Sequence, residues 1–296
     1  MWNILTKQFY RQRKDFEDSC AGRDAGLTFP EGVICSTDIA YADDGIKAHM
    51  LDIYRPEESQ EKILPVIINV HGGGLIIGNK EFNRYFCALL CKKGFLVYSI
   101  EYRLIPDCLI YDQIADVFIA MDYIKERLAA DGGDSSHVYM AGDSGGACLI
   151  TYANAIQNNT NIARAANVTP SGLRINALGL ISGMFYTSRF DKIGLFLPKY
   201  LYGRDYKKTP FAKYVNPENR ELLNSLAPVW LVTSHNDFLR RYTTDFEKAL
   251  TRAEREHELV VFPKNKKLTH AFSVFEPFLP ESSAVIDMMV EYLRKF

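Results

Sequence analysis

Short apolar runs alternate with amphipathic stretches from residue 64 to the end of the chain. An apolar run bounded by turn residues is typical of a buried strand, and apolar residues three or four positions apart are typical of a helix. Strands that alternate with helices predict a parallel sheet covered on both faces. Strands are expected at 64–70, 95–101, 138–141, 175–182, 229–234 and 259–262, and helices at 81–93, 111–130, 147–156, 242–255 and 280–296.

Two further strands come before this alternation and are expected to pair as an antiparallel hairpin. They cover 33–39 and 48–54, and the sequence Asp-Asp-Gly at 43–45 supplies the turn between them. The first 30 residues are expected to hold an amphipathic helix, which ends near residues 22–26. Its apolar residues include Trp2, Leu5, Phe9 and Phe16. The pattern as a whole predicts one α/β domain over residues 1–296, with a mostly parallel eight-stranded sheet flanked by helices.

One long stretch, between Gly183 and Pro228, breaks the alternation and is rich in aromatic residues. Long excursions inside a compact domain tend to be functional lids or binding walls. We therefore expect residues 184–224, with residues 1–30, to form a small helical cap over the carboxyl edge of the sheet. The alternative is an insertion that packs on the side of the domain. The polar stretch 159–171 is expected to be a loop.

A G-x-S-x-G sequence stands between a predicted strand and a predicted helix, as Gly142-Asp143-Ser144-Gly145-Gly146. A strand that turns directly into a helix forces the central residue into a strained backbone conformation, and flanking glycines avoid collisions there. The serine hydroxyl then stays exposed at the carboxyl edge of the sheet, in front of a helix N-terminus. We interpret Ser144 as an enzyme nucleophile; a turn that merely connects two elements is the alternative.

A second glycine motif, His-Gly-Gly-Gly at 71–74, follows the first strand of the alternation directly. Successive glycines leave backbone N–H groups uncovered, so that they can bind an oxyanion. Loops at the carboxyl ends of parallel strands rise at the same edge of the sheet, so this loop is expected to lie beside Ser144. Gly72, Gly73 and Gly145 are the expected oxyanion donors.

Three motifs together resemble the hormone-sensitive-lipase-like branch of the α/β-hydrolase fold, from roughly residue 45 onward. They are the motifs at 71–74 and 142–146 and the sequence Tyr-Arg-Leu-Ile-Pro-Asp at 102–107. The family usually has Y-R-L-A-P-E at the last of these, and alanine where Gly145 stands. Glycine keeps the N–H donor there but loosens the backbone. The resemblance implies a carboxylesterase or lipase for short to medium acyl chains, or a deacetylase.

A serine nucleophile needs a base, and the base needs a group that fixes its tautomer. In α/β-hydrolase chains the order is Ser, then Asp or Glu, then His. Asp237 follows the strand at 229–234 and matches the D-x-L position of the family. His270 follows the last predicted strand, in a histidine-plus-aromatic loop that also fits the family. These two residues are the expected acid and base.

Four other histidines are less suited to act as the base. His235 stands too near Asp237 in the sequence to fold back onto it easily, and His257 enters a strand instead of leaving one. His49 and His137 lie at or near the start of strands. We interpret the last two as structural residues.

The expected reaction is transfer of an acyl group to water. Ser144 attacks an ester carbonyl and forms an acyl-enzyme, His270 accepts the serine proton, and Asp237 holds the imidazole. Each oxyanion donor is typically worth about 3 to 4 kcal/mol in the transition state. His71 is expected to brace the glycine loop and not to react.

An apolar pocket is expected to receive the substrate. Its wall is assigned to Leu75 and Ile76, which follow the glycines, and to Phe185 and Phe196 of the aromatic stretch. A hydrophobic wall separates acyl chain lengths by only about 1 to 3 kcal/mol per methylene. The sequence therefore leaves the physiological ester and the chain-length preference open.

The composition agrees with a globular hydrolase in the cytoplasm. Hydrophobic residues make up 47% and charged residues 24%, and the net charge of −1 gives no reason to expect nucleic acid or an anionic membrane as partner. No apolar run is long enough for a membrane span, and we see no signal peptide. The six cysteines show no disulfide spacing, and neither a metal nor a cofactor is implied. A small-molecule ester is the expected partner, and a homodimer is left open.

Two other functions on the same fold are left as alternatives. A non-catalytic ligand receptor usually lacks the histidine, whereas all three triad candidates are present in this chain. A peptidase of this fold usually has an extra N-terminal domain, which a chain of 296 residues cannot hold.

Overall fold

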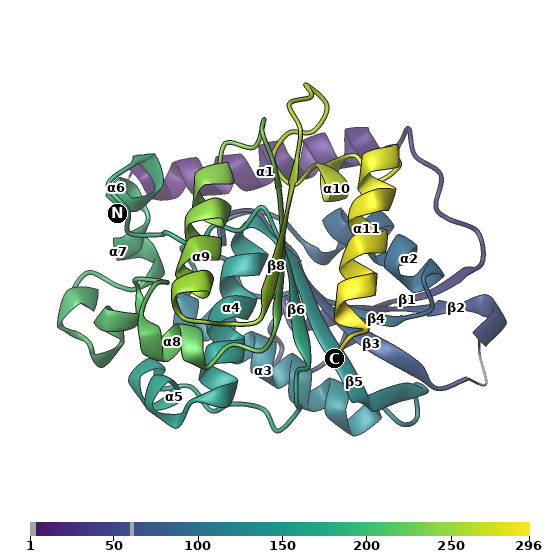
Figure 1. The fold of residues 1–296 in the computed structure, drawn as a ribbon, viewed down its shortest axis with the longest axis horizontal. Helices are drawn as coiled ribbons and strands as arrows, with labels where there is room; N and C mark the ends of the chain where they lie inside the picture. The colour runs from purple at the N-terminus through teal and green to yellow at the C-terminus, as the bar shows by residue number, and fades with distance from the viewer. Residues whose placement is uncertain (1–3, 60–61) are drawn as a thin grey trace.

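A computed structural model describes residues 4–59 and 62–296 of the protein, and it contains a single eight-stranded sheet with helices on both faces (Figure 1). The strands are β1 (Val33–Ala40), β2 (Met50–Pro56), β3 (Leu64–Val70), β4 (Leu96–Ile100), β5 (Gly133–Asp143), β6 (Ala177–Ile181), β7 (Val229–Ser234) and β8 (His257–Phe262). The larger helices are α1 (Ile4–Asp24), α2 (Arg84–Lys92), α3 (Ile110–Arg127), α4 (Ser144–Asn158), α9 (Arg240–Arg252) and α11 (Pro280–Leu293).

The strand order is β1-β2-β4-β3-β5-β6-β7-β8. Strand β2 runs antiparallel to β1 and to β4, and every neighbouring pair from β4 to β8 is parallel. This arrangement confirms the mostly parallel eight-stranded sheet and the hairpin at its start. The carboxyl ends of β3, β5, β7 and β8 therefore meet at one edge of the sheet, which is where the candidate functional residues stand.

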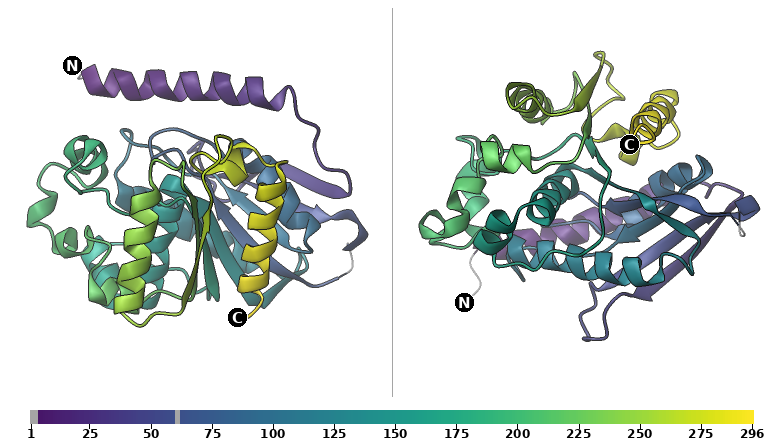
Figure 2. Two further views of the ribbon diagram at one scale, coloured as in Figure 1. Left: turned by 45° about the horizontal axis from the view of Figure 1, so that its top comes forward. Right: turned by 60° about the horizontal axis from the view of Figure 1, so that its bottom comes forward.

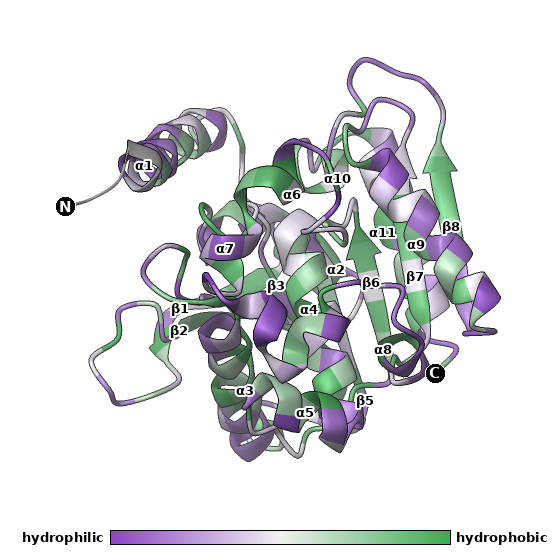
Figure 3. Cartoon of the chain, turned by 90° about the vertical axis from the view of Figure 1, so that its left-hand side faces the viewer, coloured by the Kyte–Doolittle hydropathy of each residue, from purple (hydrophilic) through white to green (hydrophobic). Residues whose placement is uncertain are grey.

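Side chains of each central strand point alternately into two separate cores. In β3, Val66 and Ile68 join the core beneath α3, α4 and α9, whereas Ile67 joins the core beneath α2 and α11. The apolar strands are thus buried on both faces, as their near-continuous hydrophobic sequences predicted. In Figure 3 these strands are coloured mostly as hydrophobic, and polar residues gather on the outer faces of the helices.

The stretch expected to be a loop at 159–171 contains a short helix, α5 (Thr160–Ala166), so that prediction was wrong. The helix begins because the side chain of Asn159 accepts hydrogen bonds from the amides of Asn161 and Ile162. It ends at Asn167, which has a φ of 53° and closes the last turn in the left-handed conformation. One side of this helix is buried in the core through Ile162, Ala163 and Ala166.

The aromatic stretch between β6 and β7, residues 184–224, folds into short helical turns and is called the β6–β7 segment below. Many of its aromatic rings pack on α3 and α4; Tyr202, Phe211 and Tyr214 are fully or almost fully buried in that cluster. The turns are α6 (Lys192–Phe196), α7 (Pro198–Leu201), η3 (Tyr206–Lys208), η4 (Pro210–Tyr214) and α8 (Arg220–Asn224).

Helix α1 lies across the loops at the carboxyl edge of the sheet, and Figure 2 shows it as one long helix along the outside of the molecule. Its Phe9 contacts Tyr200 of the β6–β7 segment edge to face, with ring centroids 5.2 Å apart, and its Phe16 contacts Phe82 in the same way at 4.8 Å. The expected helix is therefore present and ends at Asp24; Trp2 lies outside the described residues.

Three short elements complete the chain: η1 (Glu57–Ser59), η2 (Lys80–Asn83) and α10 (Phe272–Phe275). Within residues 4–59 and 62–296, no helix has the length and apolar character that crossing a bilayer requires.

Candidate active site

Ser144 stands at the junction of β5 and α4, where the strand turns into the helix without a connecting loop. Its φ is 49°, the strained conformation that the sequence predicted. A Cβ on Gly142 would lie 2.9 Å from the carbonyl oxygen of Val70, and a Cβ on Gly146 would collide with the same oxygen. Glycine is therefore required on both sides of the serine because β3 passes so close to the turn.

The three side chains that the sequence selected as nucleophile, base and acid meet at the carboxyl edge of the sheet. The Oγ atom of Ser144 lies 2.9 Å from Nε2 of His270, and Nδ1 of His270 lies 2.7 Å from Oδ1 of Asp237. Asp237 comes from the loop after β7, and His270 comes from the loop between β8 and α10. Residues separated by up to 126 positions thus form one hydrogen-bonded row.

The hydrogen-bond partners fix the tautomer of His270. A carboxylate only accepts, so Nδ1 donates to Asp237 and Nε2 is left to accept the proton of Ser144. Asp237 also accepts from the Thr233 hydroxyl at 2.8 Å and from the Leu239 amide at 2.8 Å. Burial opposes the charge of Asp237, but the hydrogen bond and electrostatic interaction with His270, together with the Leu239 amide, lower the pKa of Asp237 below its usual value.

The glycine loop, residues 71–78, begins where β3 ends and lies against the turn at Ser144. Its Gly72 amide donates to Oδ1 of Asp143 at 3.0 Å. The expectation that Gly72 binds an oxyanion was therefore wrong, because its proton is already used inside the protein. Among the described residues, the amides of Gly73 and Gly74 donate to no partner.

Gly145 faces this loop more closely than the family resemblance suggested. A Cβ at this position would lie 2.8 Å from the Leu75 amide nitrogen and 2.9 Å from the Gly74 amide nitrogen. Glycine at 145 therefore lets the glycine loop approach α4 closely. This close approach is a second role for the glycine, besides the looser backbone expected from the family resemblance. As the second residue of α4, Gly145 has an amide without an intrahelical acceptor.

A buried polar network, which no sequence motif predicted, supports the turn. Asp143 is fully buried and accepts hydrogen bonds from the Gly72 amide and, at 3.0 Å, from Nδ2 of Asn83. Asn83 also donates to Asn69 of β3 at 3.3 Å. Burial raises the pKa of Asp143 above its usual value, although these donors and the nearby imidazoles oppose the change.

Two side chains from distant helices hold the far side of the glycine loop. Gln113 of α3 donates to the Leu75 carbonyl at 3.0 Å. Arg13 of α1 donates to the Ile76 carbonyl at 2.7 Å and to the Ile105 carbonyl at 2.6 Å. Neither residue belongs to a motif, so only the folded chain reveals these contacts.

Two of the four residues assigned to the substrate pocket belong to the core. Leu75 has no exposed surface, and Phe185 is 1% exposed because it stacks on Phe246 of α9 with ring centroids 4.2 Å apart. Burial of these two side chains contradicts their assignment as open pocket walls. Ile76 is partly buried, and Phe196 is largely exposed on the β6–β7 segment.

An exposed aromatic side chain that the sequence interpretation missed lies on the candidate base. Phe238 is 74% exposed, and its ring centroid is 4.4 Å from that of His270. It stands directly after Asp237, so the strand β7 positions both residues. Position next to the acid was the signal that could have identified it.

Each of the four histidines that the sequence set aside as the base has a partner other than Ser144. His235 contacts Arg240 and His257 contacts the Arg255 carbonyl. His137 pairs with Asp134, and His49 is buried between two carboxylates. Among the described residues, no group of three His, Cys, Asp or Glu side chains could hold a metal ion.

Comparison with known proteins identifies a family and several relatives. A family model described as α/β hydrolase fold matches residues 67–273. A probable isoprenylcysteine α-carbonyl methylesterase of Oryza sativa subsp. japonica is 29% identical over 184 residues, which are 58% of this chain and 44% of that protein. Esterase LipQ of Mycobacterium tuberculosis is 32% identical over 120 residues, 40% of this chain and 28% of that protein. The chain thus spans less than half the length of these relatives.

Solved structures show the same fold over nearly the whole chain. Esterase B of Lactobacillus rhamnosus has a TM-score of 0.90 at 22% identity, covering 98% of this chain and 94% of that one. A bacterial heroin esterase has a TM-score of 0.71 at 22% identity, covering 97% and 91%. Since the family model covers well over half of its residues, the chain belongs to the α/β-hydrolase-fold family.

Proposed function

We propose that the protein is a carboxylesterase that hydrolyses esters of short to medium acyl chains through an acyl-enzyme on Ser144. The observation that carries this proposal is the unbroken hydrogen-bonded row from Asp237 through His270 to Ser144. A serine hydroxyl attacks a carbonyl only when a base removes its proton, and this base already has the tautomer that the step needs.

In the proposed reaction, Ser144 Oγ bonds to the ester carbonyl carbon while its proton passes to Nε2 of His270. Asp237 stabilises the imidazolium that forms, and its lowered pKa keeps it ionised. The tetrahedral intermediate collapses, His270 returns the proton to the leaving alkoxide, and an acyl-serine and a free alcohol result. A water molecule then repeats the sequence and releases the carboxylic acid.

The oxyanion is proposed to bind the amides of Gly73, Gly74 and Gly145. Gly145 follows the nucleophile directly, the Gly74 amide faces Gly145, and the two amides in the glycine loop have no partner among the described residues. Loss of one such donor costs about 3 to 4 kcal/mol in other hydrolases. Fixed backbone amides suit this task because they need no reorganisation as the charge develops.

We further infer that residues 1–30 and 184–224 act as the cap of this site. Helix α1 contacts the β6–β7 segment through Phe9 and Tyr200, and it contacts the glycine loop through Arg13. The exposed ring of Phe238, which lies on His270, then offers apolar surface to a substrate, and Phe196 adds an exposed ring to the cap.

Hydrolysis of p-nitrophenyl esters from acetate to laurate by the purified protein tests the proposal. We expect turnover to be highest for short or medium acyl chains and to be abolished by Ser144→Ala. Tributyrin belongs in the same panel, because esterase B was crystallised with a tributyrin phosphonate inhibitor. Ser135→Ala, at an exposed position before the nucleophile, is the matched control and should keep full activity.

Fluorophosphonate labelling separates a wrong nucleophile from a wrong substrate. Labelling of the wild type that disappears in Ser144→Ala supports the assignment even if none of the test esters is turned over. Labelling that persists in folded Ser144→Ala would place the nucleophile elsewhere, and no labelling of the wild type at all would refute the esterase proposal.

A further inference from the structure

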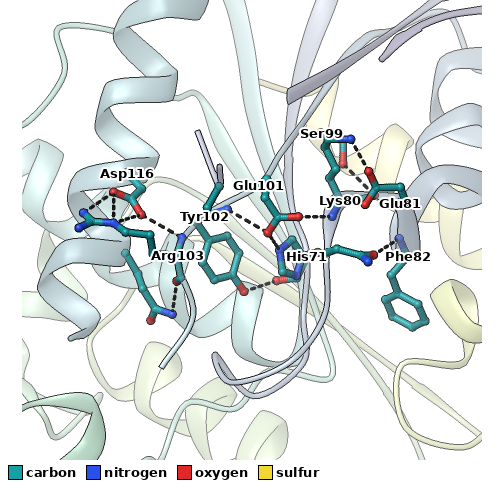
Figure 4. A network of polar contacts seen from close by, with 12 residues as sticks. His71, Lys80, Glu81, Phe82, Ser99, Glu101, Tyr102, Arg103 and Asp116 are labelled. Carbon is teal, nitrogen blue, oxygen red and sulfur yellow. Dashed lines mark hydrogen bonds and ion pairs between the residues drawn. The ribbon is translucent and has the colours of Figure 1, made fainter. Parts of the chain in front are cut away.

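The histidine that begins the glycine loop is fully buried and has a hydrogen-bond partner at each ring nitrogen. Nδ1 of His71 lies 2.9 Å from the Gly72 carbonyl oxygen, and Nε2 lies 2.9 Å from Oε1 of Glu101 (Figure 4). A carbonyl oxygen and a carboxylate oxygen can only accept hydrogen bonds. Both ring nitrogens of His71 must therefore carry protons, unless Glu101 carries one itself.

Glu101 is surrounded by donors that favour its ionised form. Besides His71, Oε1 accepts from the Tyr102 amide at 3.1 Å and Oε2 accepts from the Lys80 amide at 3.0 Å. A carboxylate that accepts several N–H bonds is stabilised as the anion, because protonation would turn one acceptor into a donor facing other donors. The shared proton of the pair therefore belongs on His71.

The surroundings of His71 favour a cation in spite of its burial. Burial lowers its pKa, but the charge and hydrogen bond of Glu101, the Gly72 carbonyl and the charge of Asp143 together raise the pKa above the ordinary value. The Tyr102 ring stacks on the imidazole with centroids 4.3 Å apart, and its hydroxyl donates to the His71 carbonyl at 2.8 Å.

The positive charge of Lys80 does not oppose a second cation in this network. Its Nζ lies 2.8 Å from Asp38 and 2.9 Å from Asp52, and it also bonds to Glu81. These three carboxylates more than balance the ammonium. Lys80 therefore contributes its amide to Glu101 while its own charge is compensated elsewhere.

We propose that His71 is a buried imidazolium that fixes the glycine loop, with Glu101 as its counter-ion. The Nδ1 proton holds the Gly72 carbonyl, while Asp143 holds the Gly72 amide, so both peptide groups of Gly72 are fixed. The amides of Gly73 and Gly74 belong to the next two residues of the chain, so the position of Gly72 determines where they point. A neutral ring protonated only at Nε2 would turn a lone pair toward the Gly72 carbonyl and release the loop there.

His71 and Glu101 are thus positioning residues that act through the loop and do not touch the substrate. Their effect on catalysis rests on the function proposed above, whereas the charge of His71 does not. The two parts of the inference therefore need separate measurements.

The charge of His71 is tested by NMR of the wild-type protein labelled with ¹⁵N-histidine, using His71→Gln to assign the ring signals. We expect both ring nitrogens to remain protonated well above the pH of about 6.5 at which an unstructured histidine loses its charge. The Glu101→Gln protein should lose this imidazolium signal. A wild-type His71 with one protonated ring nitrogen at pH 7.5 would overturn the proposal, whether or not the protein is active.

The positioning role is tested with Glu101→Gln, which keeps the shape of the side chain and removes its charge. We expect kcat for p-nitrophenyl butyrate to fall about 10- to 100-fold with little change in KM, because the oxyanion donors move by a fraction of an ångström. The amide signals of Gly73 and Gly74 should shift in parallel. Glu81→Gln removes a neighbouring charge that bonds to Lys80 but not to His71, and it should leave both readouts unchanged.

Unchanged kcat and unchanged loop amides in folded Glu101→Gln would refute the positioning role. A different result would separate this inference from the proposed function. If the wild type shows the imidazolium signal and Glu101→Gln shifts the loop amides, but the wild type hydrolyses no ester, the inference stands and the proposed function is refuted.

Discussion

Replacement of Gly145 by alanine, the residue usual at this position in hormone-sensitive-lipase-like enzymes, is expected to lower activity in this protein. The added Cβ would lie 2.8 Å from the Leu75 amide nitrogen and 2.9 Å from that of Gly74. Ordinary contacts of a Cβ begin at about 3.4 Å, so the glycine loop must retreat by about 0.6 Å. Backbone atoms on both sides leave no flexible side chain to absorb the change.

The loss can be scaled from the displacement. Misplacement of reacting groups by 1 Å costs on the order of 100-fold in rate, so a retreat of about 0.6 Å should cost roughly tenfold in kcat. A tenfold loss corresponds to about 1.4 kcal/mol in the activation barrier. The change should appear in kcat and not in KM, because the oxyanion forms only after the substrate has bound.

Steady-state kinetics with p-nitrophenyl butyrate measure both constants, and circular dichroism and thermal unfolding verify the fold. Gly22→Ala is the control, since a Cβ at this helical position has no atom within 4 Å and should leave kcat unchanged. A Gly145→Ala protein that is folded and has the kcat of the wild type, or a higher one, would refute the reasoning.

Four further predictions concern Asp237, Phe238 and Arg13. Asp237→Asn should lower kcat about 10⁴-fold by favouring the wrong tautomer of His270, and wild-type kcat in this variant would remove Asp237 from the triad. Folding lowers the pKa of Asp237, so the contribution of this carboxylate to stability is present above the unfolded pKa of about 4. The contribution is lost as the pH falls through the lowered pKa of the folded protein. Urea titrations below a pH of about 4 should therefore show the wild type losing stability faster than Asp237→Asn. Phe238→Ala should raise KM for aryl esters about 2- to 10-fold with the melting temperature unchanged, because this ring is mostly exposed; an unaltered KM would exclude contact with the substrate. Arg13→Ala should lower the free energy of unfolding by about 1 to 3 kcal/mol, measured by urea titration, because two carbonyls lose a charged donor; unchanged stability would show that α1 docks without it.

The positions of the strands along the chain and the residues at their carboxyl ends were predictable because both follow from local sequence. A near-continuous apolar run such as 64–70 has to be buried on both faces, and a glycine-serine-glycine turn after a strand has few structural solutions. Once the parallel sheet was inferred, the loops carrying Ser144 and His270 had to rise at one edge. The local sequence pattern and the parallel direction of the strands were therefore sufficient to predict that Ser144 and His270 lie at the same edge of the sheet.

The contacts that hold the glycine loop were not predictable in the same way. Arg13 reaches the loop itself, and Asn83 reaches Asp143, which binds the loop; both come from helical elements with no motif of their own, so their role depends on the packing of separate segments. The mistaken assignment of Gly72 had a similar cause, because motif spacing cannot tell whether a glycine amide points at a ligand or at Asp143. Phe185 was misassigned because an aromatic side chain beside a strand end fits a core and a pocket equally well.

Helix α1 is synthesised before every residue that it contacts in the folded protein. Its Arg13 needs the carbonyl of Ile105, its Phe9 needs Tyr200, and its Arg23 needs the carbonyl of Val274. An early helix with most of its surface in water gains little by forming alone. The segment that leaves the ribosome ahead of the sheet therefore has to wait for residues far along the chain before it can dock fully, and Arg13 can brace the glycine loop only after Ile105 has been made.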